Sequence, residues 1–356
     1  MILVYSGFFL ILLLYTQKER FAGQKKLFCF LVGLYLFLIA ALRGITHIGG
    51  AGDLLTYTTT YSHLPSTSFT SLFKDWQNGD LKDFGFYAVA KVLADIGISK
   101  QAWLGLIASL FAAAFAWFLY RYADEPLTGV LLMLVMFFSF TLTGLRQTVA
   151  LAFIFFAYGF ILEKKPIPFL LAVGVAALFH SSALIFLPAY WIAKLKIGWK
   201  QYVLIGAFLL VAIFKGDWFR QLVELLAWNE SMEHYAERET TLTWSGYIIK
   251  AFIFFFCIFA RRNVEKLPEK RAYALQALLN CMTIGLCIQS FSSVVAEAFR
   301  LSTYYFIGCT AAVPLVIANQ KNDRDRFIMY LGVGGALFAY MLYAGVYDGL
   351  RFFWQV

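Results

Sequence analysis

Residues 130–162 read VLLMLVMFFSFTLTGLRQTVALAFIFFAYGFIL, and this stretch decides the class of fold. Apart from Arg146 and Gln147, it carries no charged or amide side chain. An arginine at bilayer depth costs about 2.5–3.5 kcal/mol or more unless its guanidinium is satisfied. The stretch therefore predicts membrane-spanning helices, and it raises the question of what Arg146 contacts.

The composition of the whole chain supports the same class. Of the 356 residues, 61% are hydrophobic, 19% aromatic and only 14% charged, and the mean hydropathy is +0.70. Alternating barrel patterns are absent, so a helical bundle is the architecture that satisfies the backbone in lipid. We predict an all-α, polytopic integral membrane protein that forms a single transmembrane domain over residues 1–356. We therefore attribute the net charge of +9 to the membrane topology and not to a nucleic-acid partner.

The distribution of basic residues predicts the topology. About twelve apolar segments follow one another, near residues 2–15, 27–42, 101–119, 127–144, 147–162, 166–179, 182–193, 201–216, 246–260, 272–296, 298–318 and 327–346. The connections that fall on one side hold 18 of the 30 Lys and Arg residues but 8 of the 21 Asp and Glu residues; they are residues 17–26, 121–126, 163–166, 194–200, 261–271 and 319–326. By the positive-inside rule this side is cytoplasmic, and both termini are outside.

Three parts of this map are irregular. The short segments 166–179 and 182–193 suggest a helical hairpin with FHSSA at its tip. The outside loop 43–100 is rich in Gly, Asp, Asn and aromatic residues, as expected of a structured loop that contacts a polar ligand, and residues 85–99 within it suggest an interfacial or re-entrant helix. The outside loop 217–245 has the apolar spacing of an amphipathic surface helix.

The predicted topology brings polar residues from separate segments to the outer face. Arg43 ends the second apolar segment, and Asp53 and Tyr57 follow it. Arg146 and Gln147 lie at a turn between two helices. The remaining members of this set are His180 at the hairpin tip and Glu297 and Arg300 at the junction of two late segments.

Each of these residues also has a plain structural interpretation. An arginine at a helix end extends to the lipid head groups, His180 caps helix ends, and Asp53 shapes a turn or caps a helix. Glu297 and Arg300 are three residues apart, so they suit a mutual ion pair. The histidines and the five cysteines lack the spacing of metal ligands, so we expect no metal site. Any one of these plain interpretations can hold alone, but we do not expect all of them to hold together.

The chemistry of the set favours a phosphate-bearing ligand. Guanidinium groups bind phosphate oxygens through two hydrogen bonds and stay charged in low dielectric, and a carboxylate or imidazole nearby acts as a general base toward a hydroxyl. Because ATP is not available on the outer face, a reaction there needs an activated, membrane-borne donor. A sugar linked to polyprenyl pyrophosphate is such a donor.

The order of several motifs resembles the EpsG family of Wzy-type bacterial polysaccharide polymerases. The motifs are GGAGDLLTYTTTY, DFGFYAVAKVL, TGLRQTVALAFIFFAYGFILEKK, LFHSSALIFLPAYW and FRLSTYYF. The family shows an early Asp with a Tyr four residues later, which matches Asp53 and Tyr57, and a late Arg with a Tyr four residues later, which matches Arg300 and Tyr304. The chain departs from the family at Asp83, where Glu is frequent.

This resemblance implies a GT-C-like glycosyltransferase in the bacterial cytoplasmic membrane, with its active site facing the periplasm or exterior and with no cofactor. Its partners would be undecaprenyl-pyrophosphate-linked glycans, membrane lipids and a chain-length regulator. The expected base or positioning groups are His180, Asp53 and Glu297, and the expected pyrophosphate and substrate contacts are Arg146, Arg300, Arg43, Gln147, Tyr57, Tyr304 and Asp83.

Other classes of function stay open on the sequence alone. A lipid-linked oligosaccharide flippase would also bind pyrophosphate, although its charges should follow a transmembrane cavity. A membrane acyltransferase would use His180 as its base, but no route for an acyl donor is evident. An export scaffold would not need the polar set.

Overall fold

The computed structural model describes residues 25–45, 52–216, 244–264, 266–295 and 297–345, together with residues 347, 350 and 352. Within these ranges the chain is helical, with isolated β-bridges and no β-strand, which confirms the all-α prediction. Among the described helices, four are long and apolar enough to cross a membrane, or up to five if one bent pair counts as a span. This agrees with a polytopic membrane protein, while the count of twelve spans and the side of the termini stay predictions.

The described chain divides into two compact units. Unit 1 comprises Met1–Phe160, Ile167–Leu184 and Gly345–Val356, and unit 2 comprises Ile161–Pro166 and Ile185–Ala344. The predicted helix at residues 2–15 and nearly all of the predicted amphipathic segment 217–245 lie outside the described residues.

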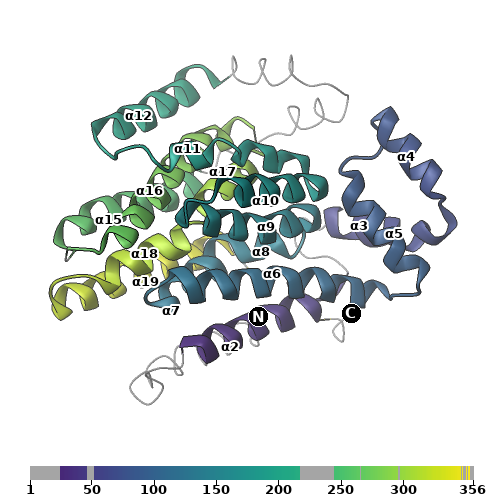
Figure 1. Ribbon diagram of the computed structural model, residues 1–356, viewed down its shortest axis with the longest axis horizontal. Coiled ribbons are helices and arrows are strands. Elements are labelled where there is room, and N and C mark those ends of the chain that lie inside the picture. Colours follow the sequence, from purple (N-terminus) through teal and green to yellow (C-terminus); the bar gives the residue numbers. More distant parts are fainter. Residues whose placement is uncertain are drawn as a thin grey trace. The chain divides into compact units, whose positions relative to one another are not determined.

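Unit 1 is built on two helices that pack along each other, α2 (Lys25–Ala41) and α6 (Lys100–Tyr122) (Figure 1). Gly33 permits their close approach, because a Cβ there would lie 3.1 Å from the Cβ of Ala116. The helix α6 begins where Ser99 accepts a hydrogen bond from the Ala102 amide, a usual N-cap interaction. The predicted segments 27–42 and 101–119 are therefore confirmed as helices.

Residues 130–162, the apolar stretch around Arg146, form a helix with a π-turn, a short turn and then a second helix. Its first part is α7 (Pro126–Met133), the π-turn η2 (Leu134–Phe138) and α8 (Ser139–Thr141). The second part is α9 (Leu145–Leu162). Arg146 is the second residue of α9, which confirms that it lies at the turn between two helices.

The outside loop 43–100 differs most from the sequence-based expectation, because most of it is helical. It contains α3 (Gly52–His63), η1 (Leu64–Ser66), α4 (Phe69–Asn78) and α5 (Phe84–Asp95), which stand together beyond one end of α6 (Figure 1). The helix predicted over residues 85–99 corresponds to α5, whereas α3 and α4 are too polar for a hydropathy scan to detect. Local signals terminate them: Ser68 caps α4, and Gly79 ends it in the left-handed conformation, with φ 86°.

Only the first arm of the predicted hairpin is one continuous α-helix. Its first arm is α10 (Pro166–Phe179), but the second arm consists of the 3₁₀ turn η3 (Ser181–Phe186) and the short helix α11 (Ala189–Ile192). Pro188 interrupts this arm, because proline has no backbone N–H to donate and fits only at helix starts. The FHSSA sequence lies at the junction between α10 and η3.

Unit 2 packs around the long helix α16 (Glu269–Gln289), which contacts α12 (Trp199–Phe214), α15 (Ser245–Ala260) and α17 (Ala298–Phe306). The helix α19 (Asp323–Ala344) packs on α15 and on α18 (Cys309–Ala318). The predicted segment 298–318 consists of two helices, α17 and α18, which meet at a 40° bend. The bend lies at residues 307–308, between the two helices, and Pro314 lies farther along, inside α18.

Candidate functional site

Asp83 is placed by an unusual backbone at the start of α5. Its φ and ψ are both 59°, a left-handed conformation that Asp tolerates better than most residues. Two residues later, Gly85 lets α5 press against the end of α10, because a Cβ at Gly85 would lie 2.5 Å from the Leu178 carbonyl oxygen. The sequence Asp-Phe-Gly thus directs the Asp83 carboxylate toward the residues that follow α10.

Three groups from other segments converge on the Asp83 carboxylate. Its Oδ2 atom accepts a hydrogen bond from Arg146 Nη1 at 2.9 Å and lies 2.7 Å from His180 Nδ1. Its Oδ1 atom accepts from the Ser181 amide at 2.8 Å. The Asp83 side chain is 1% exposed. This carboxylate therefore holds the other residues in place and is not itself presented to a ligand.

The carboxylate also fixes the orientation of the His180 ring. With Nδ1 donating to Asp83, the neutral imidazole carries its lone pair on Nε2. Within the described residues Nε2 makes no hydrogen bond, and the His180 side chain is 18% exposed. An imidazole oriented in this way by a carboxylate is suited to accept a proton from a hydroxyl group.

Arg146 is held on two sides. Besides its ion pair with Asp83, its Nε atom donates to Tyr57 Oη at 2.9 Å, and its guanidinium lies 5.6 Å from the centre of the Tyr57 ring. The Nη2 atom makes no hydrogen bond in the described part of the chain, and the side chain is 16% exposed. Arg146 thus keeps donor groups for a ligand. We call Asp83, Arg146, His180 and Tyr57 the Asp83 cluster.

The surroundings of Asp83 favour its ionised form. Burial alone raises the pKa of the carboxyl, but the hydrogen bond from His180, the charges of His180 and Arg146 and the Ser181 amide outweigh burial. The pKa of Asp83 therefore lies below its ordinary value. An ionised Asp83 is what the ion pair with Arg146 and the orientation of His180 require.

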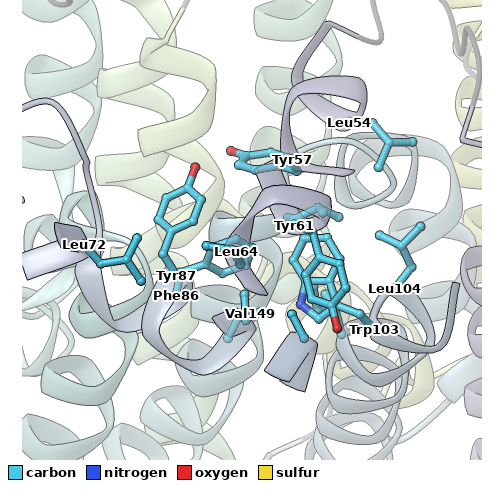
Figure 2. Packing of buried hydrophobic residues seen from close by; sticks show 14 residues of the cluster. Leu54, Tyr57, Tyr61, Leu64, Leu72, Phe86, Tyr87, Trp103, Leu104 and Val149 are labelled. Carbon is cyan, nitrogen blue, oxygen red and sulfur yellow. The ribbon is translucent and has the colours of Figure 1, made fainter. Parts of the chain in front are cut away.

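An aromatic cluster shares Tyr57 with this site. Tyr61 stacks on Trp103 at 4.4 Å between ring centroids, and Phe86 packs edge-on against Tyr57 at 5.7 Å (Figure 2). The hydroxyl groups of Tyr57 and Tyr87 point away from the packed rings (Figure 2). Since α3, α5 and α6 all contribute rings, the cluster fixes α3 and α5 to α6.

Sequence reasoning missed Tyr87. Its phenol interacts electrostatically with Arg146, Tyr57, Asp83 and Asp53, and burial, the largest cause, together with the three acidic groups raises its pKa to about 12 against the opposing effect of Arg146. Tyr87 follows Asp83 by four residues, one helical turn. That spacing in DFGFY was the signal available in the sequence. The same interactions place Asp53, on the first turn of α3, in the electrostatic surroundings of the cluster.

Arg43 and Gln147 are buried members of unit 1. Arg43 is 1% exposed, and its Nη1 atom donates to the Ala40 carbonyl at the end of α2. The Gln101 side chain binds the Ala41 and Arg43 carbonyls next to it. These contacts cap the end of α2. Gln147, one residue after Arg146, is 2% exposed. Contact of either residue with a substrate stays a prediction.

Glu297, Arg300 and Tyr304 belong to unit 2, with Glu297 and Arg300 at the start of α17 and Tyr304 near its end. The backbone carbonyl of Glu297 accepts from the Arg300 amide at 2.9 Å. The Glu297 Oε2 atom is buried and has no hydrogen-bond partner among the described residues. Tyr304 is fully buried. Their membership of one site with the Asp83 cluster stays a prediction.

Comparison with known proteins gives one match. The sequence model described as the EpsG family matches residues 26–355, nearly the full length of the chain. No curated protein and no solved structure matches. Across the described residues, no group of three or more His, Cys, Asp or Glu side chains is arranged to hold a metal ion.

Proposed function

Since this chain belongs to the EpsG family, whose members are associated with polysaccharide polymerase activity, we propose that it polymerises oligosaccharide repeat units carried on undecaprenyl pyrophosphate. The reaction takes place at the outer face of the bacterial cytoplasmic membrane and builds an O-antigen, capsule or exopolysaccharide. In this proposal the chain is a GT-C-like glycosyltransferase with about twelve spans and both termini outside. A chain-length regulator is a further proposed partner.

The proposed reaction transfers the growing chain to a new repeat unit. The acceptor hydroxyl oxygen forms a bond to the anomeric carbon of the donor, and the bond from that carbon to the pyrophosphate oxygen breaks. The electron pair leaves with undecaprenyl pyrophosphate, and the proton of the hydroxyl goes to His180 Nε2. Arg146 stabilises the negative charge that develops on the leaving pyrophosphate, with Arg300 and Arg43 as further candidates.

The observation that carries this proposal is the Asp83 carboxylate, which binds Arg146 and His180 through the same oxygen atom. This one carboxylate thereby holds both the Arg146 cation, which can bind phosphate, and the oriented imidazole of His180. Charge stabilisation and proton removal at neighbouring points are what transfer from a pyrophosphate donor requires. Asp83 is the positioning residue in this arrangement, and Glu297 and Asp53 are alternative groups for the acceptor hydroxyl.

The test of the arginine is a chain-length assay in membranes with Arg146→Lys and Arg146→Ala. Lysine keeps the charge but cannot form two parallel hydrogen bonds with a phosphate, so both variants should lose long glycan chains. Arg324→Lys, at an exposed position on α19, is the matched control and should give the wild-type ladder. A normal ladder from either Arg146 variant would exclude the pyrophosphate role.

The test of the histidine uses the pH dependence of the same assay. If His180 is the base, the wild-type rate should rise with pH, and His180→Gln should remove that rise. If His180 only supports the fold, His180→Gln should lower the amount of folded protein while the folded fraction keeps the wild-type pH profile.

Deletion of the gene separates the other classes of function. Loss of a polymerase should leave single repeat units on the lipid or on their final acceptor. Accumulation of lipid-linked units at the cytoplasmic face would indicate a flippase instead, and full-length glycan that lacks only acyl groups would indicate an acyltransferase.

A further inference from the structure

A second polar site lies in unit 2, formed by segments that the positive-inside rule places on the cytoplasmic side. A cavity of about 580 Å³ opens between the end of α15, the first half of α16 and the turn that precedes α12. Lys196, Arg261 and Arg262 line it with positive charge, while Leu275 and Leu279 of α16 contribute an apolar wall. We call this cavity the basic pocket.

The charge of the basic pocket is unbalanced. Its described lining contains three cations and no carboxylate. Arg262 and Lys196 are exposed, and Arg261 is partly exposed, so their charged groups are accessible to a ligand. The Arg262 guanidinium lies 5.3 Å from the centre of the Phe259 ring, which holds it at the apolar surface. The pocket therefore attracts an anion.

Buried amide side chains hold one wall of the pocket in shape. Asn280, 2% exposed, donates to the Leu195 carbonyl at 2.5 Å and to the Ala193 carbonyl at 3.4 Å. Gln201 donates to the Lys196 carbonyl at 3.0 Å and to Asn280 Oδ1 at 3.1 Å. Because buried amides in a membrane protein are costly unless they are satisfied, this network indicates a turn that is held in place.

The opposite wall is held in the same way. Gln320, 1% exposed, donates to the Ala260 carbonyl at 3.1 Å, and its backbone pairs with Val264 in an isolated bridge. Arg261 and Arg262 lie in the 3₁₀ turn η4 (Arg261–Asn263) between these two attachments. Both basic walls are thus fixed before any ligand binds, which lowers the entropic cost of binding.

Exposed apolar side chains beside the pocket indicate that it opens to lipid. Trp199 is 68% exposed, Leu195 57% and Phe259 59%. A tryptophan and other apolar groups next to basic residues are typical of the membrane interface. A ligand that fits both the cations and the apolar wall carries a phosphate and a hydrocarbon chain.

We propose that the basic pocket binds the phosphate head group of an anionic phospholipid of the cytoplasmic leaflet. Lys196, Arg261 and Arg262 contact the phosphate, and the first methylene groups of the acyl chains lie against Leu275 and Leu279. Basic pockets between membrane helices on the cytoplasmic side are known to take anionic lipids in this way. The pocket shares no residue with the Asp83 cluster, and its proposed ligand does not depend on the proposed reaction.

The test is lipid binding by the purified, delipidated full-length chain, measured by native mass spectrometry and by titration with phosphatidylglycerol or phosphatidylcholine. The wild type should bind phosphatidylglycerol at least about tenfold more tightly, a difference of about 1.4 kcal/mol. Arg261→Gln/Arg262→Gln, and separately Lys196→Gln on the opposite wall, should remove most of this preference. Lys26→Gln/Lys165→Gln, which removes two exposed charges elsewhere on the predicted cytoplasmic side, should keep it.

Two outcomes would overturn the proposal. In the first, the pocket variants keep the wild-type preference for phosphatidylglycerol while remaining monodisperse and as thermally stable as the Lys26→Gln/Lys165→Gln control. In the second, glycerol phosphate, the soluble head-group analogue, competes as well as the whole lipid does, which would make a free phosphate ester the ligand. Weak competition by glycerol phosphate supports the lipid.

Discussion

Asp83 contacts three other groups of the candidate site through its one carboxylate. One oxygen of its carboxylate binds Arg146 and His180 together, and the other binds the Ser181 amide. Removing one member of a buried ion pair leaves the other charge uncompensated, at a cost of about 3–5 kcal/mol. A substitution at Asp83 should therefore affect the fold of the site as well as its chemistry.

The lowered pKa of Asp83 gives a prediction for stability against pH. Its ordinary value is 3.8, and its value in the folded chain is lower, so its contribution to the free energy of unfolding is present above pH 3.8 and is lost as pH falls through the folded value. Between pH 5 and the acid limit of the assay, the wild type should lose more unfolding free energy than Asp83→Asn. Denaturant unfolding in detergent measures this, with Asp80→Asn as an exposed control that should follow the wild type. Equal losses in wild type and Asp83→Asn would contradict the assignment.

At the scale of elements, the close approach of α5 and α10 decides whether Asp83 meets His180. Gly85 presses against the backbone of Leu178, and Phe153 of α9 stacks on Phe179 at 5.7 Å, which fixes the end of α10. Interiors this closely packed do not absorb added atoms without shifting. The geometry of the site therefore depends on a glycine that has no chemistry of its own.

Glycine substitutions in the two helices test this contact. Gly85→Ala would place a Cβ 2.5 Å from a backbone oxygen, so it should destabilise the chain by about 1–3 kcal/mol and reduce polymer formation. Gly174→Ala, in α10, meets nothing within 4 Å and should be neutral or stabilise by up to about 1 kcal/mol through helix propensity. Thermal unfolding of the two variants compares them, and a Gly85→Ala protein as stable as Gly174→Ala would count against the close packing.

Helix ends were harder to predict than helix positions. Hydropathy located α2, α6, α9, α12 and α15 because lipid demands a long apolar run. It did not detect α3 and α4, which are polar, or the breaks at Pro188 and at residues 307–308. Those features depend on caps and on single backbone groups, which contribute little to an average over many residues.

At the scale of the whole molecule, the predicted topology can be tested by cysteine labelling. All five native cysteines are buried, so they should react poorly with a maleimide. Asn78 and Lys321 are exposed; the first lies in the predicted outside loop and the second in a predicted cytoplasmic connection. Asn78→Cys should label with a membrane-impermeant maleimide in intact cells, and Lys321→Cys only after permeabilisation. The reverse pattern would invert the predicted topology.

The sequence by itself determined the class of this protein, the place of most of its apolar helices and the EpsG resemblance that the family match confirmed. These follow from the chain locally, because lipid selects for runs of apolar residues and motifs are read in order. Only the tertiary structure decided that Asp83 holds Arg146, 63 residues away, and His180, 97 residues away. It also revealed the basic pocket and the place of Tyr87. Such contacts depend on how closely helices pack. A single Cβ at Gly85 would change the packing of α5 against α10, but it would hardly change the hydropathy of the sequence.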